Sequence, residues 1–233
     1  MAGQFAFAMR RGLGQFEGLT TQRSAVSPIP VLKAKAPTRI QARNREVILQ
    51  AALEVFAAAG FRGATLDEIA ARAGLSKPNL LYYFPSKEAV HNALLTQLLE
   101  TWLDPLRAMN PLGDPLLEIK SYAHRKLELA REYPRESRLF ANEILQGAPR
   151  MRGVIETDLR ALVAEKSAVI AAWMDAGKIA RSDPTHLIFS IWALTQHYAD
   201  FDVQVRAVLG DGVDPFAGAD RYLETLLTRL LQV

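Results

Sequence analysis

The stretch Thr65-Leu-Asp-Glu-Ile-Ala-Ala-Arg-Ala-Gly-Leu-Ser-Lys-Pro-Asn-Leu-Leu-Tyr-Tyr-Phe84 decides the fold. It contains two short segments, and each is preceded by a hydroxyl residue of the kind that caps helices. Thr65 and Glu68 have the spacing of a capping box for the first segment, and Ser76 precedes the second. Between them, Gly74 tolerates the positive φ that a tight turn requires. The stretch therefore predicts a helix-turn-helix.

The side chains around this turn fit the packing of such a motif. The small residues Ala70 and Ala71 let the two helices approach closely, and Leu75 can fill the junction. The second helix has an apolar inner face, formed by Leu80 and Phe84, and a polar outer face. A tight corner inside any helical protein is the alternative interpretation. The caps, the turn and the basic surroundings together favour a DNA-binding motif.

Apolar residues continue at helical spacing on both sides of the motif. One helix precedes it, from near Gln41 to Gly60, and a long helix follows from Lys87 to Met109. Five more helices are expected at 114–132, 134–146, 149–176, 184–209 and 215–231. Proline or glycine stands at each junction. No alternation of Val, Ile and Thr predicts a strand, so we expect an all-α fold.

The expected architecture is a three-helix N-terminal helix-turn-helix domain followed by a larger C-terminal helical domain. We place the DNA-binding domain at 39–86 and an effector-binding and dimerisation domain at 87–233. Residues 1–38 mix Gly, Ser, Pro, Gln and Lys without apolar periodicity. We expect them to form a disordered tail, with a basic arm that touches DNA as the alternative.

Charge and composition narrow the class of protein. Residues 1–90 contain 12 Lys and Arg against 6 Asp and Glu, whereas residues 91–233 contain 16 against 19. A basic front half suggests a polyanionic partner. The chain has no cysteine, which excludes disulfides and thiolate chemistry and is compatible with a reducing cytoplasm. No apolar run is long enough to cross a membrane, so we expect a cytoplasmic protein without a membrane partner.

No catalytic constellation stands out. The four histidines have no metal-ligand spacing, and there is no P-loop or Gly-x-Ser-x-Gly elbow. Gly12-Leu-Gly14 lacks the third glycine and the preceding strand of a dinucleotide site. We therefore expect no enzyme, no catalytic residues and no metal. An architectural DNA-binding protein is a further alternative, against which the large C-terminal domain argues.

The segment from Arg45 to Leu95, and above all Thr65 to Ala89, resembles the DNA-binding signature of TetR-type transcription regulators. One departure is Leu81, where the family often has a tyrosine. One usual phosphate contact is therefore missing, and Tyr82 and Tyr83 are left to supply it. The resemblance implies a regulator that binds operator DNA and loses affinity when a small molecule enters its C-terminal domain.

The second helix of the motif is the expected recognition helix. Lys77 and Asn79 lie at its N-terminal end, where Asn can pair with adenine and Lys can reach guanine acceptors. Lys87 begins the next helix and is expected to hold phosphate, with a solvated surface lysine as the alternative. The full set of expected DNA-binding residues is Thr65, Ser76, Lys77, Asn79, Tyr82, Tyr83 and Lys87.

Stretches of the C-terminal part, among them Ser137-Arg-Leu-Phe140 and Trp192 to Phe201, resemble a pyrimidine-responsive branch of the TetR-type family. The resemblance implies a homodimer and a small-molecule effector such as uracil or thymine, with no cofactor besides. A regulator of another pathway with a different effector is the alternative.

A pocket needs polar groups among apolar ones, and a dimer needs an apolar face. Gln196 beside Trp192 offers an amide for a pyrimidine edge and an indole for its face. The expected effector residues are Trp102, Tyr122, Asn142, Glu143, Trp192 and Gln196. The expected dimer residues are Ile191, Leu194, Tyr198, Leu223, Leu226 and Leu230. Ordinary packing inside one subunit is the alternative for most of them.

Overall fold

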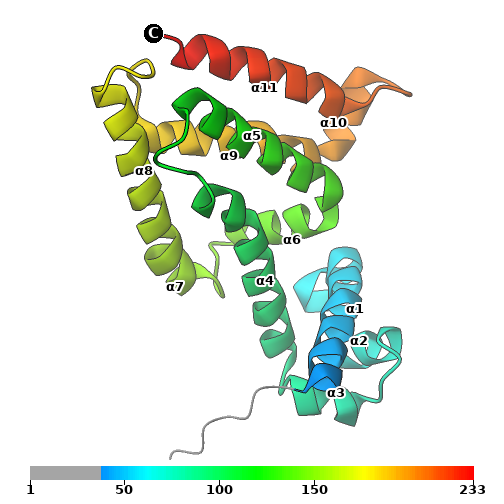
Figure 1. Cartoon of the computed structure of the whole chain (residues 1–233). Helices are drawn as coiled ribbons and strands as arrows, with labels where there is room; N and C mark the ends of the chain where they lie inside the picture. Colours follow the sequence, from blue (N-terminus) through cyan, green and yellow to red (C-terminus); the bar gives the residue numbers. More distant parts are fainter. Residues whose placement is uncertain (1–37) are drawn as a thin grey trace, which may run out of the picture. The chain divides into compact units, whose positions relative to one another are not determined.

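The computed structural model describes residues 38–233 (Figure 1). The predicted tail at 1–38 lies, apart from Thr38, outside the described residues. The first helices are α1 (Arg39–Gly63), α2 (Leu66–Arg72), α3 (Lys77–Tyr83) and α4 (Lys87–Arg107). They are followed by α5 (Pro115–Glu132), α6 (Pro134–Leu145), α7 (Arg152–Val154), a π-helical turn η1 (Ile155–Leu159), α8 (Arg160–Asp175), α9 (Pro184–Asp200), α10 (Asp202–Leu209) and α11 (Pro215–Leu231). No strand occurs between residues 38 and 233, which confirms the all-α prediction.

The caps of the helix-turn-helix form as the sequence predicts. The Thr65 hydroxyl accepts from the Glu68 backbone N–H at 3.2 Å, and the Glu68 carboxylate accepts from the Thr65 N–H at 2.9 Å. The Ser76 hydroxyl accepts from the Asn79 N–H at 3.4 Å. Gly74 has a φ of 67°, a left-handed conformation that glycine adopts without steric cost. These local interactions set the angle between α2 and α3.

Helix α4 connects the two parts of the described chain (Figure 1). It contacts α1 near its start and α5 near its end. One apolar core, around the fully buried Ile48, Phe56 and Leu95, joins α1–α3 to α4 as far as Leu103 and continues into α6 and the segment after it. A second core joins α5, α8, α9 and α11 to the end of α4. None of the helices between residues 38 and 233 is long and apolar enough to span a bilayer.

Two predicted helices are interrupted. The helix expected at 184–209 ends at Asp200, because Phe201 leaves helical geometry with φ −113° and ψ 29°. Arg138 donates to the Ala199 carbonyl at 3.0 Å at this break. The helix expected at 149–176 begins only at Arg152, since Ala148 has a φ of 52° and turns the chain first.

Candidate functional site

The N-terminal turn of α3 presents two polar side chains to solvent. Lys77 is exposed, and its ammonium lies 2.9 Å from the Asp67 carboxylate of α2. Asn79 is exposed, and its side-chain amide has no hydrogen-bond partner within residues 38–233. The opposite face of α3 is anchored by Leu80, which is completely buried. This geometry leaves the amide of Asn79 free for a base edge, while Lys77 has to leave Asp67 before it can reach one.

The two tyrosines at the end of α3 have different environments. Tyr82 is 71% exposed and its hydroxyl accepts from the Gln41 amide at 3.0 Å. Tyr83 is half-buried, and its hydroxyl accepts from the Asn44 amide at 2.8 Å. Arg45 also donates to the Tyr83 carbonyl at 3.1 Å. Both tyrosines therefore join α3 to α1, and the exposed Tyr82 is in addition accessible to a phosphate.

Lys87 has a role that the sequence did not indicate. Its ammonium donates to the carbonyls of Phe61 and Ala64, both at 2.8 Å, and lies 4.6 Å from the centre of the Phe61 ring. Two of its three donors are thus occupied by the segment 61–64, which comprises the end of α1 and the residue after it. In this conformation the side chain holds this segment against α4, and the phosphate contact expected of Lys87 stays a prediction.

Lys87→Met is therefore expected to act on stability rather than on the salt dependence of DNA binding. The variant leaves two partly buried carbonyls without their charged donor, which costs about 1–3 kcal/mol. A phosphate contact would instead appear as a loss of about one in the salt slope of operator binding. Urea unfolding and operator titrations at several salt concentrations separate the two roles. A changed slope with unchanged stability would contradict the structural role.

The expected effector residues do not form a single cluster of contacting side chains. The Trp192 indole of α9 donates to the Tyr122 hydroxyl of α5 at 2.5 Å, so these two polar groups satisfy each other. Gln196 is half-buried, one turn further along α9. Asn142 is exposed on α6. Its place on the outer face of α6 separates it from the buried pair.

Glu143 has a partner inside the protein. Its carboxylate is buried and lies 2.9 Å from the Arg150 guanidinium, and it also accepts from the Arg150 backbone N–H at 2.8 Å. The expectation of an effector contact at Glu143 is therefore wrong for this conformation, because both carboxylate oxygens are already engaged.

Trp102 on α4 is buried, and its indole N–H has no hydrogen-bond partner within the described part of the chain. A buried donor without a partner is unfavourable. The indole N–H could therefore donate to an acceptor on a bound ligand. Lys126 of α5 lies beside it, with its ammonium 5.7 Å from the centre of the indole. The Tyr133 ring lies on the same indole, at 6.3 Å between ring centres.

Lys126 is also buried, and no ion pair or hydrogen bond joins it to residues 38–233. Burial lowers the pKa of its ammonium to about 7, against a weaker opposing effect of the Asp200 carboxylate. Asp200 accepts from the Ser137 hydroxyl at 2.6 Å, and burial raises the pKa of its carboxyl. We call the set Trp102, Lys126, Ser137 and Asp200 the polar chamber, a name that refers to these four side chains alone.

Sequence reasoning missed Lys126, although a signal was present. Lys126 stands at helical spacing with Ile119, Tyr122 and Ala130, which all face the core of α5. A lysine on an apolar stripe is unusual, because burying a charge without a partner is costly. Such a residue is a candidate for function.

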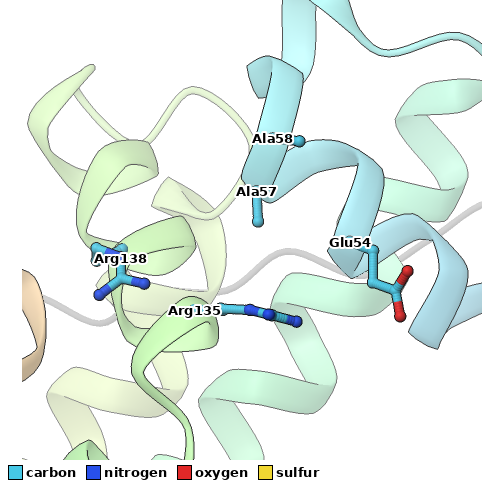
Figure 2. Close-up of a pocket in the computed structure, with 5 residues that line it drawn as sticks. All are labelled: Glu54, Ala57, Ala58, Arg135 and Arg138. Carbon is cyan, nitrogen blue, oxygen red and sulfur yellow. The ribbon is translucent and has the colours of Figure 1, made fainter.

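Two surface hollows lie away from the polar chamber. One of about 480 Å³ separates α1 from α6 and is lined by Glu54, Ala57, Ala58, Arg135 and Arg138. Figure 2 shows Arg135 extending from α6 toward the α1 side of this hollow. Another, of about 570 Å³, runs between α5 and α11. The expected effector residues do not line either of them.

The expected dimer residues divide into two groups. Ile191 and Leu223 are buried inside one subunit, at 1% and 3% exposure. Their assignment to a subunit interface is wrong, because packing around α5 already covers them. Leu194 and Tyr198 are half-buried against a third apolar core, which contains Leu223. Leu226 is half-buried and Leu230 is 46% exposed on the outer face of α11.

Comparison with known proteins gives the family. The family model described as bacterial regulatory proteins, tetR family, matches residues 48–94, and that of the YcdC-like protein C-terminal region matches residues 95–233. The chain belongs to the TetR family of regulators. The sequence-based resemblance to this family is thereby confirmed, and so is the expectation of a transcriptional regulator rather than an enzyme. TetR-family regulators bind operator DNA.

Individual relatives agree with this TetR assignment. The chain is 53% identical to the HTH-type transcriptional regulator RutR of Escherichia coli K12 over 173 residues, which is 74% of this chain and 82% of RutR. A solved transcriptional regulator from Streptomyces coelicolor has 25% identity and a TM-score of 0.66, and the match covers 81% and 98% of the two chains. The fatty acid degradation regulator FadR of Bacillus halodurans, at 17% identity and a TM-score of 0.61 over 84% and 96%, shares the fold.

Proposed function

We propose that this TetR-family regulator binds a two-fold symmetric operator as a homodimer and releases it when uracil or thymine enters the polar chamber. The observation that carries the effector proposal is the buried Trp102 N–H without a partner, next to the buried side chain of Lys126, which forms no ion pair within residues 38–233. The identity to RutR over most of the chain supports a pyrimidine as the ligand. No cofactor besides the effector is proposed.

The donors of the polar chamber determine the ligand chemistry. The Trp102 indole N–H and, in its charged form, the Lys126 ammonium can only donate hydrogen bonds. Uracil and thymine present two ring carbonyl oxygens as acceptors, whereas cytosine has an amino group in place of one of them. An amino group against these donors would leave buried polar atoms unmatched, at about 1–3 kcal/mol. We therefore propose that the chamber accepts a dioxopyrimidine and discriminates against cytosine, and that Gln196 and Trp192 border it.

Calorimetry with uracil, thymine and cytosine tests the effector, combined with operator titrations in the presence of each base. We expect heat and weaker operator binding with the first two bases only. Binding of neither base, or binding that leaves operator affinity unchanged, would refute the pyrimidine switch. The assignment to the family would stand in that case.

Asn79 provides the test of base recognition. Asn79→Ala is expected to weaken binding to the specific operator by about 1–3 kcal/mol and to relax the base preference at one position of each half-site. Binding to random DNA should hardly change, because phosphate contacts supply most of that affinity. Titrations with operator and random duplexes measure both. Tyr82→Phe, which removes an expected phosphate contact, is the matched control and should weaken both duplexes alike.

A further inference from the structure

Phe61 lies in the last turn of α1, after the kink at Gly60, and is contacted by three polar side chains. The Arg150 guanidinium lies 3.7 Å from the centre of its ring, and the Lys87 ammonium lies 4.6 Å from it. The buried His91 imidazole meets the ring edge-on at 4.9 Å. Arg150 belongs to the loop between α6 and α7, so this contact ties the C-terminal domain to the DNA-binding domain.

Arg150 is itself fixed by Glu143, the expected effector residue whose carboxylate it occupies. The pair is largely buried, with side-chain exposures of 21% and 3%. A buried ion pair adds little net stability, yet removal of one partner is strongly unfavourable. The pair therefore specifies one geometry of the loop more than it stabilises the protein.

The backbone of this loop is strained at one residue, Ala148. Gly147 and Ala148 adopt positive φ values of 87° and 52°, and Ala148 is the only non-glycine residue with this geometry in residues 38–233. The Ala148 N–H donates to the Glu143 carbonyl at 2.9 Å. Strained backbone persists where the surroundings enforce it, and it is common in segments that switch.

Helix α6 links this loop to the polar chamber. Ser137, which donates to Asp200, and Glu143 both lie on α6, separated by about 9 Å at 1.5 Å per residue. A rigid helix that shifts at Ser137 must move Glu143 as well. Arg150 would follow Glu143, and its ring contact with Phe61 would change.

We propose that Glu143, Arg150 and Phe61 form a coupling clamp, which transmits the state of the polar chamber to the DNA-binding domain. The inference rests on the proposed effector function. Glu143 and Arg150 are positioning residues in this scheme, because neither touches the effector. The clamp is one discrete contact between the domains, and its two arrangements would correspond to operator-bound and released states.

The test compares Arg150→Met with the matched control Arg152→Met, whose side chain is exposed and pairs only with Glu156. Operator affinity is titrated with and without uracil, and uracil binding is followed by calorimetry. Couplings between sites are commonly about 5- to 150-fold. We expect Arg150→Met to bind uracil as the wild type does but to lose most of the change in operator affinity, and Arg152→Met to keep it.

Arg150→Lys should restore little of the effect of uracil on operator affinity, because lysine lacks the planar guanidinium that pairs with Glu143 and stacks on Phe61. A lower melting temperature with an unchanged coupling ratio in Arg150→Met would show a merely structural residue and overturn the proposal.

A second measurement does not need the effector. The chain has no cysteine, so spin labels at Ala71→Cys and Ala168→Cys report the distance between α2 and α8. We expect Arg150→Met to broaden or shift this distance distribution and Arg152→Met to leave it unchanged. If the wild-type protein does not bind uracil, the proposed effector is wrong. The distance distributions still test whether Arg150 holds the two domains in one arrangement. Identical distributions for both variants would overturn it.

Discussion

A Lys126→Met variant is expected to be more stable than the wild type and to lose the binding of uracil and thymine. Burial lowers the pKa of Lys126 from 10.5 to about 7, which corresponds to a destabilisation of up to about 5 kcal/mol in the charged form. Methionine has a similar length and no charge to desolvate. It also removes one of the two proposed donors, so the heat of effector binding should vanish.

Urea unfolding and calorimetry measure the two effects, with Lys178→Met on the exposed surface as the control. The control should change neither. A Lys126→Met protein that still binds uracil with wild-type affinity would remove Lys126 from the effector site.

The same variant should change how stability depends on pH. Because folding lowers the pKa of Lys126, the unfolded chain binds more protons than the folded protein between about pH 7 and 10.5. The wild-type free energy of unfolding therefore gains a contribution that rises with pH in this window, and the destabilisation is fully present below it. In Lys126→Met this rise should be absent. Parallel wild-type and variant curves over the window would contradict a buried, titrating Lys126.

The helix-turn-helix could be predicted from the sequence because its determinants are local. Thr65 and Glu68 cap α2, Ser76 caps α3, and Gly74 supplies the turn, all within a span of 12 residues. Even here the partner of Lys87 was missed, since the carbonyls it binds lie 23 and 26 residues away. Helix caps can be predicted because both partners lie within a few residues of each other, whereas a hydrogen bond between distant segments depends on the fold.

The effector site depends on contacts between distant segments, and the sequence identified it only in part. Trp102 was expected there, but Lys126 and Asp200 join it from α5 and α9. The sequence could not show that Glu143 lies outside the polar chamber. Its partner Arg150 reaches it only because the chain turns between them, with positive φ values at two residues. Ala148 gives no sign in the sequence that it adopts one of them.

The dimer prediction has the largest expected effect on DNA binding. The outer face of α11 presents Tyr222, Leu226 and Leu230 at four-residue spacing, with Tyr222 56% exposed. Such a stripe favours packing against another helix. We propose that it meets the equivalent stripe of a second copy across a two-fold axis. The core residues Ile191 and Leu223 support this face from inside the subunit.

Leu226→Glu is therefore expected to yield monomers, because the interface would bury two carboxylates close together. Operator affinity should fall about 100- to 10,000-fold, since the two half-sites are no longer bound by linked domains. Leu112→Glu is the control, because Leu112 is 92% exposed in the loop between α4 and α5. Light scattering and operator titration measure both variants. A soluble Leu226→Glu dimer with wild-type operator affinity would show that the subunits associate through another surface.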